Sequence, residues 1–346
     1  MPVGDIGKTG ARSALAFRQE TTYGTFALTT TAIHAFVPTS VNFLTKFDGR
    51  KLDQLAVQRG YGSFVQLNKM VEGSVEGYLH PDEGTLHFLT NALGGRLTFN
   101  SLTSAGDHSI TTGNFSASDT MLSLSFWVQK GDEQSFRYTG GVINNLKISA
   151  AVGEPVTISL DVVFQDSSIS TADTLTTSLS FSTQPPFTFV DGTFRYDATE
   201  GSLTSTVAEE IQSFELEINN NLVVDSGARE LGSRVFSRRP PAGRREVKFK
   251  IKQRFDTSTT FNRFVQATQG AAQLFFRGAS ISAEFFRDLT ITMPNVRNIT
   301  GDVEIGGANE VLEAEIEYAV LVSGNLATST SREIGCTLRN AITTSQ

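Results

Sequence analysis

The chain of 346 residues has one cysteine, Cys336, and one tryptophan, Trp127. A single cysteine excludes an intrachain disulfide and a zinc site built from cysteine ligands, so folding needs no oxidising compartment. Long apolar runs are also missing, since none approaches the ~20 residues that a membrane-spanning helix needs. Residues 1–9 are polar and Gly-rich and lack the apolar stretch of a signal peptide. We therefore expect no disulfide, no leader and no membrane span.

Catalytic constellations are missing as well. The four histidines form no His-x-x-x-His or His-Glu-x-x-His pair: His34, His80, His87 and His108. Residues 107–109 read Asp-His-Ser, but neighbours on one strand or turn cannot converge on one reacting atom. Residues 4–9 resemble the end of a phosphate-binding loop, yet Pro2 stands where its first glycine belongs. The sequence thus predicts no catalytic residue, no cofactor and no metal site, and no enzyme.

Positive charge is in deficit, with a net charge of −7. An acidic chain is not a general binder of nucleic acid or of anionic membranes. Basic residues nevertheless gather in one Pro-containing loop, and three interpretations of it stay open: a nucleic-acid patch, a solvated loop, or a docking loop for another subunit, where arginine is favoured. The arginines of this loop are Arg229, Arg234, Arg238, Arg239, Arg244 and Arg245.

The sequence is rich in residue types and alternating patterns that are typical of β-strands. It holds 26 phenylalanines among many Thr, Ser and Val residues, a mixture that favours strands. Residues 214–218, 247–252, 313–318 and 156–162 alternate apolar and polar side chains, which is typical of strands with one buried and one wet face. The carboxylates on these runs fit a solvated sheet face better than a catalytic pair. The prediction is an all-β fold.

Two helices are predicted, and they reveal an internal repeat. Residues 82–93 have Asp82 as a candidate N-cap and glycine after their last apolar residue, and residues 257–268 show similar spacing. Each helix follows a strand, and each such strand follows a long polar segment, residues 46–63 or 223–245. The order strand, long loop, strand, helix, strands therefore occurs twice.

This repeat predicts two tandem domains of β-sandwich or β-barrel type, each with one flanking helix. The expected divisions are an N-terminal arm (1–30), a first domain (31–165), a Ser/Thr-rich linker (166–186), a second domain (187–325) and a C-terminal extension (326–346).

Two stretches resemble a known family. Residues 17–25, Phe-Arg-Gln-Glu-Thr-Thr-Tyr-Gly-Thr, are similar to the opening signature of siphophage major tail tube proteins. Residues 136–149, followed by Gly-Glu-Pro-Val at 153–156, are similar to the block that leads into the closing strand of that family. No clear second copy of the Tyr-Gly signature is present in the second half. The resemblance implies a sandwich or barrel whose copies form rings that stack into a tube, and two domains per chain imply rings of three chains with pseudo-sixfold symmetry.

The resemblance suggests a structural subunit of the conduit for DNA ejection. A channel wall that lets DNA slide should be neutral or acidic, because Lys and Arg would hold phosphates. We predict that these polar strand faces line the lumen: Glu72, Glu76, Asp161, Glu215, Glu217, Lys248, Lys250, Lys252, Glu313, Glu315 and Glu317. The family's long loop bridges subunits or rings, so docking roles are predicted for Arg50, Lys51, Arg59, Arg229, Arg234, Arg238 and Arg239.

The expected partners are other copies of the chain, the terminator, tape measure and distal tail proteins, and DNA in transit, with no membrane. The expected location is the virion tail, after assembly in the host cytoplasm. Two alternatives stay open. One is another virion structural protein, such as a baseplate hub, tail terminator or decoration protein. The other is a β-sandwich carbohydrate-binding module, which would favour a cluster of exposed Trp and Tyr and so fits a single tryptophan poorly.

Overall fold

The computed structural model describes residues 14–26, 33–52, 63–94, 96–102, 105–111, 121–130, 134–170, 184–224, 228–255, 258–301, 303, 312–324 and 332–341. These residues form an all-β protein of antiparallel strands with two α-helices, as expected. No helix among them is long and apolar enough to cross a membrane.

The elements follow one another along the chain in two runs. The first comprises β1 (Ala14–Gln19), β2 (His34–Phe36), β3 (Pro38–Lys51), β4 (Phe64–Tyr78), α1 (Glu83–Leu93), β5 (Arg96–Ser101), β6 (Gly106–Thr111), β7 (Leu124–Lys130), β8 (Gln134–Ala151), β9 (Thr157–Phe164) and β10 (Asp166–Ser170). The second comprises β11 (Gly192–Asp197), β12 (Ser213–Asn219), β13 (Glu246–Arg254), α2 (Thr259–Val265), β14 (Gln269–Ser280), β15 (Phe286–Asn298), β16 (Glu313–Val320) and β17 (Gly335–Asn340).

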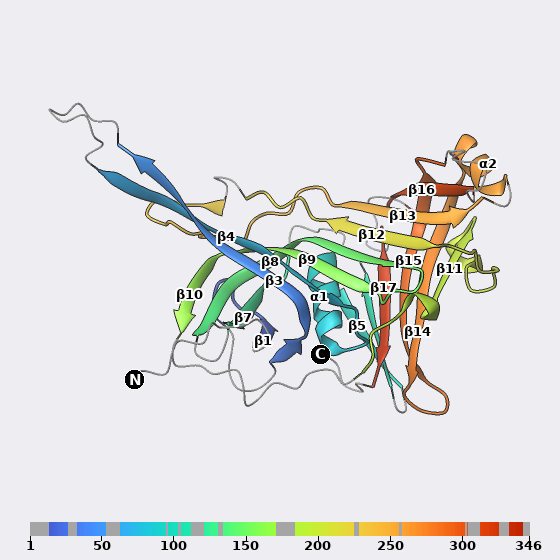
Figure 1. The fold of residues 1–346 in the computed structure, drawn as a ribbon, viewed down its shortest axis with the longest axis horizontal. Coiled ribbons are helices and arrows are strands. Elements are labelled where there is room, and N and C mark those ends of the chain that lie inside the picture. Colours follow the sequence, from blue (N-terminus) through green and yellow to red (C-terminus); the bar gives the residue numbers. More distant parts are fainter. Residues whose placement is uncertain are drawn as a thin grey trace, which may run out of the picture.

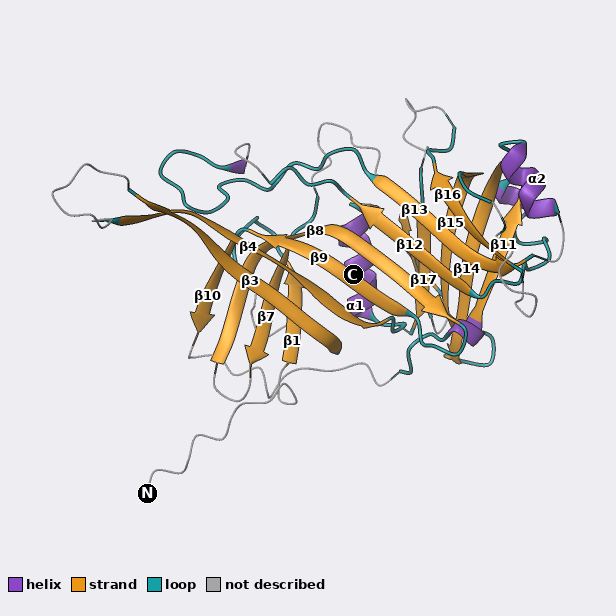
Figure 2. Ribbon diagram, turned by 45° about the horizontal axis from the view of Figure 1, so that its top comes forward, coloured by secondary structure: helices purple, strands orange, loops and turns teal. Residues whose placement is uncertain are grey.

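One long sheet runs through both halves of the molecule, in the order β3–β4–β9–β8–β12–β13–β16. Its central junction is the pairing of β8 with β12, in register from Ala151–Ser213 to Asn145–Asn219. Figure 2 shows β9, β8, β12 and β13 side by side across the middle of the molecule. The two halves are therefore joined by backbone hydrogen bonds and not by a covalent connection alone.

Two further groups of strands, each continuous with the long sheet through β8 or through a short β15–β16 pairing, cover its apolar side. The first has the order β2–β1–β7–β8–β10, and β8 belongs to it through its N-terminal part. The second has the order β11–β14–β15–β17–β6–β5, so the β5–β6 hairpin of the first run lies in a sheet made mostly by the second. A single apolar cluster includes buried side chains from both halves.

The alternating runs form the strands that they predict. In β12 the buried residues Phe214, Leu216 and Ile218 alternate with partly exposed Glu215 and Glu217, and β13 and β16 follow the same pattern. The strand–loop–strand–helix order also recurs, as β3–β4–α1 and β12–β13–α2. In each copy the strand before the helix pairs with a later closing strand, β4 with β9 and β13 with β16.

Helix α1 begins and ends where its sequence predicts. The Asp82 side chain accepts a hydrogen bond of 2.9 Å from the Thr85 backbone N–H, and Gly94 ends the helix at φ +57°. Helix α2 is shorter than the predicted 257–268, because Gln266 ends it and Gln269 already belongs to β14. Residues 256–257, at the start of the predicted helix, lie outside the described residues.

Strands occupy parts of the chain that we expected to be arms or linker. Ala14–Gln19 of the expected arm is β1, in which Leu15 and Phe17 are fully buried. Gly335–Asn340 of the expected extension is β17, which lies between β15 and β6. The first five residues of the expected linker are β10. The division into two tube domains between these segments stays a prediction.

Candidate assembly surface: the polar face of the long sheet

The eleven residues predicted to line a lumen all lie on one face of the long sheet. Glu72 and Glu76 come from β4, Asp161 comes from β9, and the other eight come from β12, β13 and β16. Cross-strand register places them together: Glu217 lies opposite Lys248, and Lys250 lies opposite both Glu215 and Glu317. None of the eleven is buried, and the alternate residues of the same strands form the core.

Besides Lys46 of β3, which pairs with Glu72, sequence reasoning missed three charged residues on the part of this face that runs from β4 to β16. Lys147 of β8 lies opposite Glu217, Glu246 opposite Asn219, and Arg254 opposite Glu313. Only the structure could add Lys147, because nothing local shows that β8 joins the two halves. With these three, the face from β4 to β16 holds nine carboxylates and five cations, a net charge of −4.

Lysines on this surface are paired with glutamates. Lys147 Nζ lies 2.7 Å from Glu215, Lys248 lies 3.3 Å from Glu246, and Lys250 lies 3.6 Å from Glu317. Lys252 pairs with Glu313, and this ion pair lowers the pKa of the Glu313 carboxyl. Each pair is at least partly exposed to solvent, so it adds little to stability. Their larger effect is on the surface charge, since each lysine already has an anionic partner.

The arginine loop lies over one end of the same sheet. The backbone N–H of Lys69 in β4 donates to the Arg234 carbonyl at 2.8 Å. Phe236 is fully buried against Val142 of β8 and Val163 of β9, which form an apolar patch at this end of the polar face. The loop of the second half is therefore part of the folded structure of the first half.

The arginines predicted for docking divide into two groups. Arg229 donates to the carbonyls of Arg234 and Lys69, and Arg239 lies 5.4 Å from the Tyr23 ring centroid and donates to Ser123 Oγ. Both arginines contact their own chain, and their docking role stays a prediction. Arg234 is exposed, and Arg238 is exposed in an ion pair with Glu230. Arg59 lies outside the described residues.

The β3–β4 hairpin projects from one end of the molecule (Figure 1). Apolar side chains near its far end are exposed, with Phe47 at 50% and Phe64 at 61%. The predicted docking residues Arg50 and Lys51 lie on the same ribbon and are also exposed. Exposed phenylalanines on a two-stranded ribbon are unfavourable in water, so this arrangement fits a surface that contacts another molecule.

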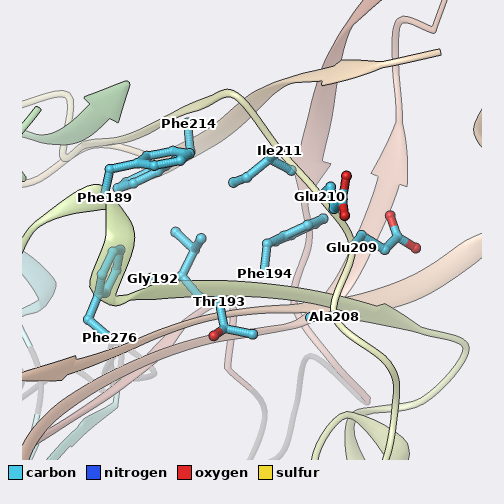
Figure 3. Close-up of a pocket in the computed structure, with 11 residues that line it drawn as sticks. Phe189, Gly192, Thr193, Phe194, Ala208, Glu209, Glu210, Ile211, Phe214 and Phe276 are labelled. Carbon is cyan, nitrogen blue, oxygen red and sulfur yellow. The ribbon is translucent and has the colours of Figure 1, made fainter. Parts of the chain in front are cut away.

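A pocket of ≈ 370 Å³ opens beside β11 and β12. Figure 3 shows aromatic rings, including those of Phe189 and Phe214, on one side and the carboxylates of Glu209 and Glu210 at the other end. Glu209 is held by Arg263 at 2.7 Å. The described residues that line this pocket include no histidine, cysteine, serine or lysine.

The Asp-His-Ser run forms no catalytic triad. Asp107 pairs with Arg339 at 2.6 Å, His108 is buried with a ring nitrogen 3.2 Å from Asn340 Oδ1, and Ser109 contacts Thr337. All three contacts join β6 to β17, so this run holds a sheet together. Trp127 is half-buried on β7, where it lies 6.4 Å from the Phe26 ring centroid.

Fold and surface together define an all-β protein with a broad polar face on its long sheet. Comparison with known families matches residues 10–320 to the phage tail tube proteins, and the chain belongs to this family. No curated protein matches the chain. Family membership indicates a structural, self-associating component of a virion tail that works with other tail proteins.

Proposed function

We propose that this chain forms rings that stack into a tail tube, with the polar face of the long sheet as the inner wall. The observation that carries this proposal is the β8–β12 pairing, which makes one sheet from the strands of both halves. Its polar face stays accessible while its other face is buried against the remaining sheets. A wall built from several copies needs such a curved, two-faced sheet.

The ring is proposed to hold three chains. Within one chain, the β8–β12 junction makes the contact that a ring of single-domain subunits would make between neighbours. Strand β3 pairs with β4 alone among the described strands, so one edge of the long sheet has unpaired backbone groups. A strand of the next copy that pairs with this edge would cover it, as sheet edges require. Three chains would then supply six similar sets of strands.

Electron microscopy of the purified, concentrated protein tests this arrangement. The expected result is long hollow filaments of uniform width, whose reconstruction shows threefold chain symmetry and close-to-sixfold strand symmetry. Discrete single rings or capped particles would favour the alternative of a terminator, hub or decoration protein. A soluble monomer that binds glycans would favour the carbohydrate-binding alternative.

The inner wall is proposed to let DNA pass without holding it. Its net negative charge repels phosphates, and the glutamate partners of the lysines lower the number of cations available to them. Glu217→Lys with Glu315→Lys should give tubes that retain short DNA at low salt and release it at high salt. The matched control is Glu154→Lys with Glu284→Lys, two exposed residues outside this face. Equal retention by both double variants would overturn the lumen assignment.

The β3–β4 hairpin is proposed as the main contact between copies, with Arg234 and Arg238 of the arginine loop at its side. Phe47→Ser with Phe64→Ser should leave a folded monomer and weaken polymerisation at least tenfold, measured as the critical concentration. Val190→Ser with Val207→Ser changes two other exposed apolar residues and serves as the control. Deleting the whole arginine loop is a poor test, because it removes the buried residues Phe236 and Arg245.

The remaining roles follow from this assembly. The terminator, tape measure and distal tail proteins are proposed to contact the tube at its ends or inside it, with assembly in the host cytoplasm and no membrane contact. The chain is proposed to act without catalysis.

A further inference from the structure

Two histidines and a glutamate from distant parts of the chain meet beside helix α1. His34 begins β2, while Glu83 and His87 lie one turn apart on α1 and so share one face of the helix. His34 Nδ1 lies 3.4 Å from Glu83 Oε2, and the ring centroids of His34 and His87 are 4.2 Å apart. One side-chain donor atom from each residue lies within 4.8 Å of the other two.

One ring nitrogen in this three-residue group lacks a hydrogen bond. His87 Nε2 is buried and has no hydrogen-bond partner among the described residues. A buried polar atom without a partner costs about 1–3 kcal/mol and calls for an explanation. The nitrogen belongs to the same three-residue group, so a bound cation would satisfy it.

The surroundings favour a fixed site. The Phe17 ring of β1 lies against both imidazoles, with centroid distances of 5.6 Å to His34 and 6.3 Å to His87. The Asp82 cap fixes the helix turn that carries Glu83. Apolar and hydrogen-bonded neighbours of this kind hold ligands in place.

We propose that His34, Glu83 and His87 bind one first-row divalent cation of the zinc type, which ties β2 to the first turn of α1. Two imidazole nitrogens and one carboxylate oxygen match the ligands of Zn²⁺, whereas Mg²⁺ and Ca²⁺ prefer all-oxygen sites. Three protein ligands leave a fourth position for water or for a ligand from another copy. Bonds of about 2.0–2.2 Å would need small side-chain rotations to bring the three donor atoms closer together. The site is structural, because it joins elements that are far apart in sequence.

The test uses the full chain without an affinity tag, stripped with chelator and titrated with ZnCl₂ by calorimetry. We expect one equivalent of Zn²⁺ per chain, and a rise in the melting midpoint of about 5 °C at a hundredfold excess over the dissociation constant. MgCl₂ should produce neither effect. Co²⁺ in place of Zn²⁺ should give the visible absorption of a tetrahedral site.

His87→Gln and Glu83→Gln should each weaken Zn²⁺ binding at least tenfold and remove the rise in melting midpoint. Glu83 is partly exposed, so its variant keeps the test valid if His87→Gln fails to fold. His80→Gln is the matched control, since His80 contacts the Gln184 carbonyl outside this group. Zinc binding that is absent from the unchanged chain, or unaffected by both ligand variants, would overturn the proposal. Neither outcome bears on tube formation, which is tested separately by microscopy.

Discussion

The two helices follow equivalent strands, β4 and β13, yet they differ greatly in how far they are buried. Nine of the eleven residues of α1 are buried, whereas only Thr260 is buried in α2. Figure 1 shows α1 among the sheets near the centre of the molecule and α2 at its far end. Val265 of α2 is 64% exposed. The same order of elements has therefore produced a core helix in one half and a surface helix in the other.

The ends of the helices show why. The carbonyls at the C-terminal end of α1 accept hydrogen bonds from the second half: Asn220 Nδ2 donates to Ala92 at 2.9 Å, and Arg245 donates to Leu93 at 2.7 Å. A helix end buried in this way needs such donors. Helix α2 has no side-chain hydrogen bond at its N-cap. Helix α1 is therefore part of the junction between the halves. We expect substitutions that remove its contacts to lower the free energy of unfolding far more than the matched substitutions in α2.

The largest difference is expected in the aromatic core. Phe88 of α1 is fully buried and stacks on Phe17 at 4.4 Å, so Phe88→Ala should lower the free energy of unfolding by about 3–5 kcal/mol. Phe261 of α2 is 38% exposed, and Phe261→Ala should cost less than about 1.5 kcal/mol. Urea unfolding of the monomers measures both. Equal losses would contradict the contrast between the helices.

Buried hydrogen bonds from the arginines should give the next largest difference. Arg245→Met leaves the Leu93 carbonyl and Asn220 Oδ1 without this donor, and should cost about 2–3 kcal/mol. Arg263 pairs with Glu209 near the surface, so Arg263→Met should cost about 1 kcal/mol or less. Thermal melts of the two variants compare them directly. A smaller loss for Arg245→Met would show that the junction does not depend on this side chain.

The C-terminal ends of the helices predict effects of different size. Gly94 has φ +57°, and a Cβ there would lie 2.9 Å from Met121 Sδ, so Gly94→Ala should cost about 1–2 kcal/mol. Ala267, just beyond α2, has φ +48°. Ala267→Gly removes the backbone strain of a positive φ in the folded state, but it also raises the conformational entropy of the unfolded chain. These two effects oppose each other, so the net change in the free energy of unfolding should stay within about 0.5 kcal/mol. The measurement is again the unfolding midpoint, and a loss above 1 kcal/mol for Ala267→Gly would contradict the expected relief.

The N-caps should give the smallest contrast. Asp82→Ala removes the hydrogen bond to Thr85 and should cost about 1 kcal/mol. Ser258→Ala in α2 removes a side chain that makes no capping bond, so its effect should be close to zero. A comparable loss in both would mean that Ser258 caps α2 in solution.

Local signals explain what could be predicted. The alternation in residues 214–218 and 247–252 is a property of neighbouring residues, and so is the Asp82 to Gly94 pattern of α1. These gave the strands, their wet faces and one helix almost to the residue. The all-β class followed from the same alternating runs, whereas the family resemblance came from residues 17–25 and 136–149.

Contacts between distant residues explain what was missed. β1 and β17 lack strong alternation and are buried because of strands more than a hundred residues away. Lys147 meets Glu215 and Glu217 of the second half only through the β8–β12 pairing. His34 meets His87 only because β2 lies beside α1. Sequence spacing contains none of this information.

The pairing of β6 with β17 also has a consequence for the newly made chain. Asp107 and Arg339, which meet in it, are 232 residues apart. At a synthesis rate of about 5–20 residues per second, β6 would wait roughly 10–50 s on the ribosome for its partner strand. During that time one edge of the β5–β6 hairpin has no neighbour and can pair with other chains. Slower translation of this protein should therefore raise the fraction lost to aggregation, and a chaperone that covers the hairpin should lower it.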